Sequence, residues 1–185
     1  MPTYISLLRA INVSGQNAIR MADLTALYQS LEFGRVRTYL QSGNVVFDAA
    51  QQEIAALADL IEAHIQRAFG HQVVVLIRRP AELQRLAEAN PFLNNGRLED
   101  IAFLHVTFLS SSPSAELFAR LNPTNAGADE FAAAEREIFL FCPNGYGRTK
   151  LNNTFFEKKL AVPATTRNWK TVLSLIRMCG ELPEK

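Results

Sequence analysis

The chain has 185 residues, enough for one large domain or two small ones, and 48% of them are hydrophobic, which is enough for a packed core. The formal net charge of +1 excludes a strong overall attraction to nucleic acid or membranes, so any such attraction must come from a local cluster. Two cysteines without a Cys-x-x-Cys spacing, an N-terminus without a signal-peptide pattern and short apolar runs favour a cytoplasmic protein that does not enter a membrane.

The first 79 residues predict six elements in the order βαββαβ. Alternating apolar residues mark the strands, and apolar residues three and four apart mark the helices. The elements are a strand over 3–8, a helix that begins near Asp23 and is ended by Gly34, a strand over 35–40, a hairpin turn over 41–44, a strand over 45–48, a helix over 51–69 that is stopped by Gly70, and a strand over 72–77. We therefore predict a ferredoxin-like βαββαβ subdomain over residues 1–79.

The remaining residues predict a connecting segment and a smaller subdomain. Pro80 begins a third helix, because proline at the first helical position loses no hydrogen bond, and the segment 80–98 forms a helix and linker. Residues 99–185 predict a three-stranded antiparallel sheet with C-terminal helices, so the fold class is α+β. Their elements are a strand over 101–109, a helix from Ser112-Pro113, a hairpin over 129–134 and 137–142, and two closing helices, the last with Thr165 or Thr166 as its N-cap. The sequence shows no internal repeat.

Two polar loops in the first subdomain form one candidate site. The first two strands of a ferredoxin-like sheet run parallel, so the loop 9–20 and the turn 41–44 should lie side by side at one end of the sheet. Asn, Ser and Gly are ordinary turn residues, but glycines also let a ligand approach the backbone. The candidate ligand-binding residues here are Arg9, Asn12, Ser14, Gly15, Asn17, Gln41, Ser42, Gly43 and Asn44.

A second polar cluster lies in the stretch "PNGYGRTKLNNTFF" (143–156). A glycine-rich turn before a helix N-terminus can bind an anion, although the spacing is not that of a Walker A motif. Residues 146–170 contain six positive side chains and one negative, a net charge of +5. The alternative is a hairpin exit with a solvated basic face. The candidates here are Gly147, Arg148, Lys150, Arg167 and Asn168, the last two expected in the first turn of the final helix.

Other chemistries lack a signal. The three histidines stand in no recognised motif, no spacing of His, Cys or acidic residues indicates a metal, and no Gly-x-Ser-x-Gly elbow is present. We therefore predict no metal and no cofactor. An RNA-recognition motif shares the βαββαβ order, but its base-stacking positions here hold Asn44 and Val46, so nucleic acid could bind only through phosphates and loops.

Four of these stretches also carry a family resemblance. They are "LLRAINVSGQNAIRMADL", "VRTYLQSGNVVFD", "GYGRTKLNNTFFEKKL" and "TTRNWKTVLSL". In this order, over nearly the whole chain, they are similar to the bacterial family called domain of unknown function 1697. The resemblance implies a small α/β protein of two subdomains and brings no established activity. The usual family loop resembles Gly-Ile-Asn-Val-Gly-Gly, and Ala10 and Ser14 take two of its glycine positions here.

The leading functional hypothesis is a binding protein for a small phosphorylated or otherwise anionic ligand, nucleotide-like in character, at polar loops between the two subdomains. One alternative is a nucleic-acid-binding module that uses the basic segment 146–170. Another is an enzyme that acts on a phosphorylated substrate. The sequence leaves open which ligand is bound, what the oligomeric state is and whether the two polar clusters meet in space.

Overall fold

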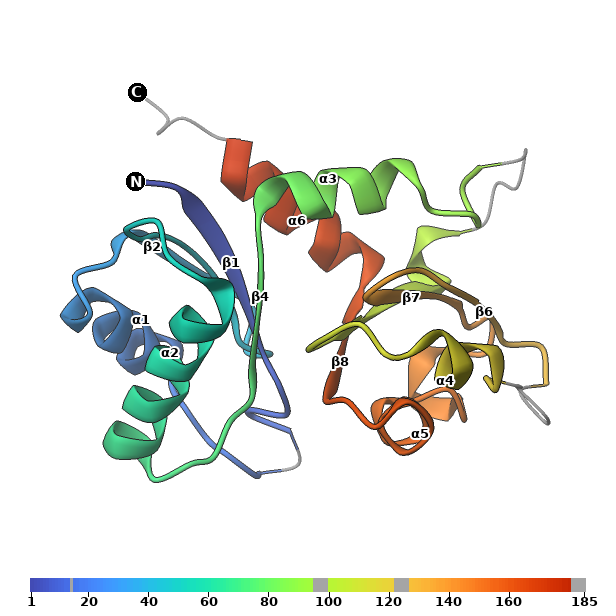
Figure 1. Ribbon diagram of the computed structural model, residues 1–185, viewed down its shortest axis with the longest axis horizontal. Helices are drawn as coiled ribbons and strands as arrows, with labels where there is room; N and C mark the ends of the chain where they lie inside the picture. The colour runs from blue at the N-terminus through green and yellow to red at the C-terminus, as the bar shows by residue number, and fades with distance from the viewer. Residues whose placement is uncertain (14, 95–99, 122–126, 181–185) are drawn as a thin grey trace. The chain divides into compact units, whose positions relative to one another are not determined.

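The computed structural model describes residues 1–13, 15–94, 100–121 and 127–180 (Figure 1). The chain divides into two compact units. Unit 1 consists of Met1–Gln84 and Leu175–Lys185, and unit 2 of Arg85–Ser174. The chain therefore leaves unit 1 within helix α3 (Pro80–Glu88) and returns to it within helix α6 (Trp169–Gly180).

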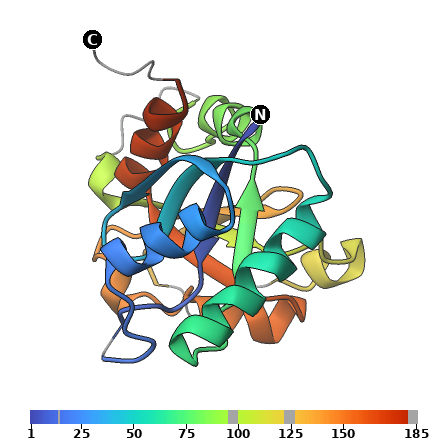
Figure 2. The same cartoon turned by 90° about the vertical axis from the view of Figure 1, so that its left-hand side faces the viewer.

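Unit 1 contains the predicted six elements in the predicted order. They are β1 (Thr3–Leu8), α1 (Met21–Ser30), β2 (Gly34–Tyr39), β3 (Asn44–Asp48), α2 (Ile54–Phe69) and β4 (Val75–Arg78). The sheet has the strand order β2-β3-β1-β4, and every neighbouring pair is antiparallel. Helices α1 and α2 lie side by side against one face of this sheet (Figure 2).

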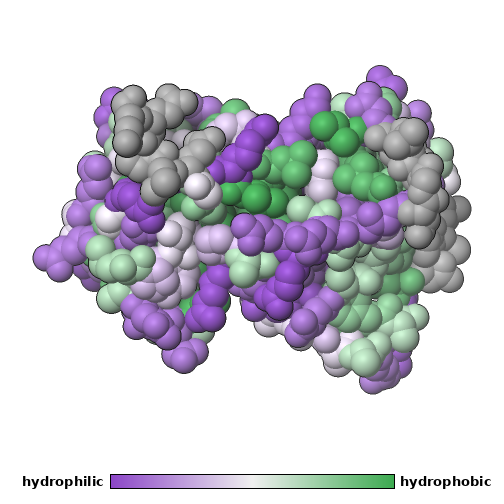
Figure 3. Space-filling model, turned by 90° about the horizontal axis from the view of Figure 1, so that it is seen from above, coloured by the Kyte–Doolittle hydropathy of each residue, from purple (hydrophilic) through white to green (hydrophobic). Residues whose placement is uncertain are grey.

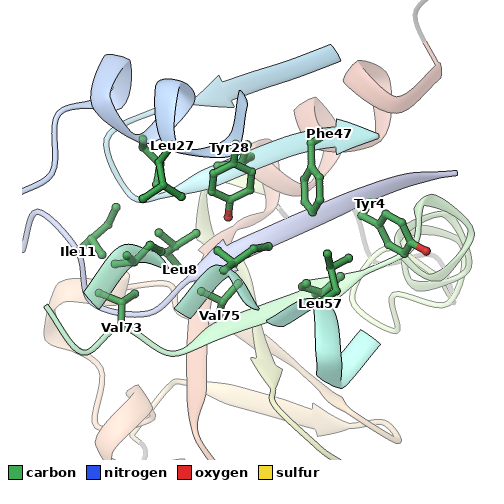
Figure 4. Packing of buried hydrophobic residues seen from close by; sticks show 14 of the residues in the cluster. Tyr4, Leu8, Ile11, Leu27, Tyr28, Phe47, Leu57, Val73 and Val75 are labelled. Atoms are coloured by element: carbon green, nitrogen blue, oxygen red, sulfur yellow. The ribbon is translucent and has the colours of Figure 1, made fainter. Parts of the chain in front are cut away.

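The core of unit 1 fills the space between that sheet face and the two helices. Alternation along β1 turns Tyr4 and Leu8 toward the helices, where they pack with Phe47, Leu57 and other buried side chains (Figure 4). Burial of each such side chain stabilises the fold by about 1.5–3 kcal/mol. Between Tyr4 and Leu8, Ser6 is also fully buried, and its hydroxyl lies 2.7 Å from the Tyr28 hydroxyl. This hydrogen bond satisfies two polar atoms inside an apolar layer.

The end of α1 differs from the prediction. The helix ends at Ser30, Glu32 makes the left-handed turn with a φ of 60°, and Gly34 is already the first residue of β2. A glycine after an apolar stripe does not by itself distinguish a helix stop from a strand start. The other glycine stop is confirmed, because Gly70 ends α2 in the left-handed conformation with a φ of 73°.

Unit 2 has a four-stranded sheet, so the prediction of a three-stranded sheet is wrong. Its strand order is β6-β7-β5-β8, again with antiparallel neighbours. The elements are η1 (Ile101–Phe103), β5 (Leu104–Leu109), α4 (Ala115–Ala119), β6 (Glu130–Ala133), β7 (Glu137–Phe141), η2 (Tyr146–Arg148), α5 (Asn153–Leu160) and β8 (Ala164–Asn168).

The missed strand is β8, which was predicted as the beginning of the last helix. Thr165 and Thr166 are not its N-cap. They are β-branched residues that pair with Phe108 and Thr107 of β5. Arg167 and Asn168 are strand residues too, and the Asn168 Oδ1 caps α6 by accepting a hydrogen bond of 2.9 Å from the backbone N of Lys170. The apolar spacing from Trp169 marks the helix but cannot show that the preceding residues pair with a distant strand.

The two units repeat one topology without a repeat in sequence. Each runs strand, helix, two strands, helix, strand, and each places its first strand between its third and fourth. The end of the first strand is held in the same way in both units. In unit 1, the backbone N of Leu8 donates to the Gly43 O (2.8 Å) and that of Arg9 to the Val74 O (2.9 Å). In unit 2, the backbone N of Leu109 donates to the Arg136 O (2.9 Å) and that of Ser110 to the Pro163 O (2.9 Å).

The surface is mixed in polarity. On the face shown in Figure 3, hydrophilic side chains are spread widely and hydrophobic ones gather in patches between them. Within the part of the chain that the structure describes, no helix is long and apolar enough to cross a membrane. Among its exposed large hydrophobic residues are Val13 and Leu40, at 56% and 55% exposure. Both lie in the polar loops of unit 1.

The buried Ser6–Tyr28 hydrogen bond provides a test of the core of unit 1. We expect Tyr28→Phe to lower the free energy of unfolding by about 1–2 kcal/mol, because it leaves the Ser6 hydroxyl buried without its partner. The double variant Ser6→Ala/Tyr28→Phe removes both polar atoms and should lose less than the sum of the two single variants. Urea unfolding followed by circular dichroism measures all three, and strictly additive losses would contradict the coupling.

Candidate functional site

The two polar loops of unit 1 contact each other directly, as predicted. Strands β1 and β2 are both antiparallel to β3, so the chain leaves them at the same end of the sheet. The Asn12 Nδ2 group donates a hydrogen bond of 2.8 Å to the backbone O of Gln41. We call residues 9–20 and 40–43 together the loop pair.

The asparagine side chains of this region hold the backbone in place. Asn12 also donates through Nδ2 to the backbone O of Ile19 at 2.9 Å, and its Oδ1 accepts from the Ile19 N at 2.8 Å. Asn17 Nδ2 donates to the Ala10 O at 3.1 Å. Buried Asn44 donates to the Tyr39 O at 2.7 Å and to the Ser42 Oγ at 3.0 Å. Asparagines that were predicted to contact a ligand therefore position the loops.

Left-handed backbone is concentrated in the loop pair. Non-glycine residues adopt a positive φ at a cost of about 1–2 kcal/mol each, so the surrounding structure must hold them there. The loop pair contains four of the seven such residues in the described chain. Its positive-φ residues, with their φ values, are Ala10 (53°), Asn12 (54°), Gly15 (76°), Asn17 (48°), Leu40 (57°) and Gly43 (76°).

Gly43 meets a second requirement of the loop pair. A Cβ at this position would lie 2.7 Å from the Cδ1 of Ile11 and 2.8 Å from the Cβ of Leu8. Both neighbours are fully buried, so neither can move away cheaply. The glycine thus allows the turn after β2 to lie directly on the end of β1.

The backbone at the start of the first loop has two donors without a described acceptor. Ile11 lies between two left-handed residues, Ala10 and Asn12, and such an alternation of backbone hand forms a concavity of N–H groups that suits an anion. Within the part of the chain that the structure describes, the backbone N–H groups of Ala10 and Ile11 donate a hydrogen bond to no acceptor. Ala10 is exposed, so its N–H is available to a ligand or to water, whereas Ile11 is buried.

The remaining predicted residues of the loop pair differ in their exposure to solvent. Gly15 and Gln41 are exposed, Arg9 is half-buried and next to Ala10, and Ser14 lies outside the described residues. Arg20 is exposed and forms an ion pair with Asp23, with 2.7 Å between Nε and Oδ2. Arg9, which directly precedes Ala10, is the cation nearest to the concavity along the chain.

In unit 2, the glycine-rich turn after β7 packs against a histidine ring of β5. The Tyr146 ring of η2 stacks on the His105 ring of β5, with 4.9 Å between centroids and 25° between planes. The His105 Nδ1 lies 3.3 Å from the Phe103 O, and the His105 Nε2 lies 3.3 Å from the Asn168 Nδ2. A carbonyl only accepts and Nδ2 only donates, so the ring is neutral with its hydrogen on Nδ1. Burial lowers the pKa of His105, which agrees with this state.

A chain of hydroxyl groups lies beside this stack. The Thr166 Oγ1 donates to the Asn153 Oδ1 at 2.7 Å, so the Thr107 Oγ1, also 2.7 Å from Thr166, must be the donor in that pair. The Tyr146 hydroxyl is buried without a well-formed hydrogen bond, although Thr166 lies close enough to influence it. Burial raises the pKa of Tyr146, so its hydroxyl keeps its hydrogen at neutral pH.

Of these unit 2 residues, Asn168 was a predicted candidate, and the others were not. His105 and Thr107 were visible as two polar residues at alternate positions of an apolar strand, a pattern that indicates a polar patch on one sheet face. Thr166 and Asn168 could join them only once β8 was known. The cluster anchors the turn 143–150 and leaves its charged side chains outside.

The predicted candidates in the basic segment of unit 2 separate into exposed and buried residues. Gly147, Arg148 and Lys150 are exposed. Arg167 is only 6% exposed, and its Nη1 donates to the Thr165 Oγ1 at 2.8 Å and to the Thr166 O at 3.0 Å. Burial lowers the pKa of Arg167 to about 10. It keeps its charge at neutral pH but does not belong to the exposed basic surface.

The N-terminus of α5 is occupied by the protein itself. The Asn152 Oδ1 accepts from the backbone N of Phe155 at 3.0 Å, and the Thr149 Oγ1 accepts from the Leu151 N at 3.0 Å. An anion at this helix would have to compete with these bonds. Among the described residues, no group of three or more His, Cys, Asp or Glu side chains is arranged to hold a metal ion.

Comparison with known proteins places the chain in a family. The family model "Protein of unknown function (DUF1697)" matches residues 1–139. The chain belongs to this family. A conserved bacterial protein from Streptococcus pneumoniae has a similar structure, with a TM-score of 0.74 and 21% sequence identity over 96% of this chain and 98% of that chain. This likeness concerns the fold alone. No curated protein matches the sequence.

The role of Asn12 gives a test of the loop pair. Asn12→Asp keeps the shape of the side chain and the acceptor for the Ile19 N, but it directs a carboxylate oxygen at two backbone carbonyls. We expect the free energy of unfolding to fall by about 2 kcal/mol or more at neutral pH. A protonated carboxyl can donate again, so the loss should shrink as the pH falls. Urea unfolding at pH 7 and pH 4 measures both effects.

Asn144→Asp is the matched control, because Asn144 is exposed and its side chain bonds no described residue. It should change the free energy of unfolding by less than about 0.5 kcal/mol. Equal losses in the two variants would show that Asn12 does not hold the loop pair together.

Proposed function

We propose that this DUF1697 protein binds a small phosphorylated or otherwise anionic molecule at the loop pair of unit 1. A comparison of the two units is the main support. Their topology is the same, yet the connection from first strand to first helix has five residues in unit 2 (110–114) and twelve in unit 1 (9–20). The topology therefore does not require the additional residues, and elaborated loops on a rigid scaffold are where binding sites usually lie.

The chemistry of the loop pair supports an anion as the ligand. The backbone N–H of the exposed Ala10 is a donor without an acceptor among the described residues, and Arg9, the preceding residue, adds a positive charge. Gln16 and Gln41 can contribute exposed amide groups. The side chains of Asn12 and Asn17 hold the loop in one conformation, which lowers the entropic cost of binding.

Two finer assignments belong to the same proposal. We infer a ferredoxin-like arrangement for unit 1, supported by its βαββαβ order and its all-antiparallel sheet of order β2-β3-β1-β4. The repeat of that order in unit 2 extends the inference to both units. The free thiols of Cys142 and Cys179 support function in the reducing cytoplasm.

Titration with inorganic phosphate and with adenosine monophosphate tests the proposal. We expect saturable shifts of the backbone amide signals of residues 9–20 and 40–43 in ¹H–¹⁵N spectra. Arg9→Gln should weaken binding at least about tenfold, because it removes a charge-assisted contact. Arg79→Gln, at an exposed arginine outside the loop pair, should leave the affinity unchanged. Shifts confined to other residues, or equal affinity in both variants, would reject the loop pair as the site.

A second candidate is nucleic-acid binding through residues 146–170 of unit 2. One observation favours it: five of the six cations in this segment are exposed, and the sixth is the buried Arg167. Exposed cations neutralise phosphates and release counterions, which makes the affinity steeply dependent on salt. This candidate uses different residues from the loop pair, so the two can be tested separately.

Single-stranded RNA and duplex DNA of about 20 nucleotides test the second candidate. If the segment binds phosphates, the logarithm of the affinity should fall linearly with that of the salt concentration, and Lys158→Gln/Lys159→Gln should reduce the slope by about 1–2. Arg9→Gln should leave this slope unchanged. A slope that the double lysine variant does not alter would contradict binding through this segment.

A further inference from the structure

A groove between α1 and α2 of unit 1 has no role in the functions proposed above. Its volume is about 470 Å³, within the range of roughly 300–1,000 Å³ found for small-molecule sites. Its lining comes from residues of 23–30 on α1 and of 64–69 on α2, helices that lie side by side in Figure 2. None of these residues belongs to the loop pair, so the groove is a separate feature of the same unit.

The groove is lined by large apolar side chains and by small ones. Leu27 and Phe69 contribute large apolar side chains, and Ala26 and Ala68 lie where larger residues would fill the space. Both alanines are exposed, so the groove is open to solvent. It can therefore take the apolar body of a small ligand that reaches it from outside.

The charges around the groove do not cancel. The Asp23 carboxylate is held by Arg20 through two bonds, Nε to Oδ2 at 2.7 Å and Nη2 to Oδ1 at 3.0 Å. Arg67, in contrast, makes no ion pair or hydrogen bond with any residue that the structure describes. The groove thus has one positive charge without a partner, three residues along α2 from His64.

His64 contributes a polar atom near that charge. Its Nδ1 lies 2.8 Å from the Leu60 backbone O, and because a carbonyl only accepts, Nδ1 carries the hydrogen. The Nε2 is bonded to no described residue and is left for a ligand. Residues 64 and 67 are neighbours on a helix surface, so the His64 ring lies near the Arg67 side chain. With the hydrogen on Nδ1, Nε2 is an acceptor, so a carboxylate is bound by Arg67 and not by His64.

We propose that the α1–α2 groove binds a small carboxylic acid with an apolar body. Arg67 takes the carboxylate through two parallel N–H···O bonds, beside His64, and the body of the ligand covers Leu27 and Phe69. The paired Asp23 does not repel the ligand, because its charge is compensated by Arg20. A neutral molecule of the same shape can fill the groove but makes no charge-assisted bond, so it binds more weakly.

Benzoate and benzyl alcohol are the matched probes for this site. In ¹H–¹⁵N spectra of the full chain, benzoate should shift the amide signals of residues 23–30 and 64–69 with saturation, and it should bind at least about tenfold more tightly than benzyl alcohol. Equal affinities of the two probes, saturation without shifts at these residues, or no saturable shift would overturn the proposal. Phosphate binding at the loop pair is measured through residues 9–20, so the two sites succeed or fail independently.

Two pairs of variants locate the interaction. Arg67→Gln should reduce the affinity for benzoate to that for benzyl alcohol, and Arg79→Gln should leave it unchanged. Ala68→Leu fills the groove and should weaken both probes, whereas Ala56→Leu, at an exposed alanine of α2 outside the groove, should weaken neither. Circular dichroism checks that the Arg67→Gln variant is folded. If the folded variant binds benzoate as tightly as the parent protein does, the proposed role of the charge is overturned.

Discussion

Antiparallel pairing of one central strand with both of its neighbours determines where the loops of each unit lie. In unit 1, β1 pairs with β3 and β4, and β2 also pairs with β3, so β1 and β2 point the same way. The chain must therefore leave both strands at one end of the sheet. The Asn12–Gln41 contact and the close approach of Gly43 to Leu8 follow from this pairing. Unit 2 has the same order and the same backbone bonds at the end of its first strand.

The two units act as controls for each other, because one topology is built with different connections. Unit 1 has a long connection after its first strand, twelve residues against five in unit 2. Unit 2 has a long connection after its third strand, where eleven residues (142–152) stand in place of five (49–53) in unit 1. These long connections contain the two polar stretches that stand out in the sequence. Since the shorter version suffices for the fold in each case, the added residues need another explanation, and ligand binding is the one proposed for unit 1.

The sequence predicts the elements of unit 1 and the contact between its loops, because these depend on local patterns and on one topological rule. It fails at β8, where two threonines suit a strand and a helix cap equally well and the choice depends on pairing with β5, more than fifty residues away. It also fails on the roles of asparagines. Asn12, Asn17 and Asn44 are predicted as ligand-binding residues, and only coordinates show that their amides point at the protein's own carbonyls. The His105–Tyr146 stack requires both a correct sheet and the path of the turn after β7.

The left-handed residues of the loop pair explain how these asparagines would serve the proposed binding site. The resemblance to the family places glycine at position 10, and the structure places Ala10 there with a φ of 53°. Alanine costs about 1–2 kcal/mol in this conformation, which the bonds of Asn12 and Asn17 must offset. A loop that tolerates such residues is fixed by its contacts and not by the freedom of glycine. The conformation of the loop is therefore set before a ligand arrives, so the proposed binding would require little ordering of the chain.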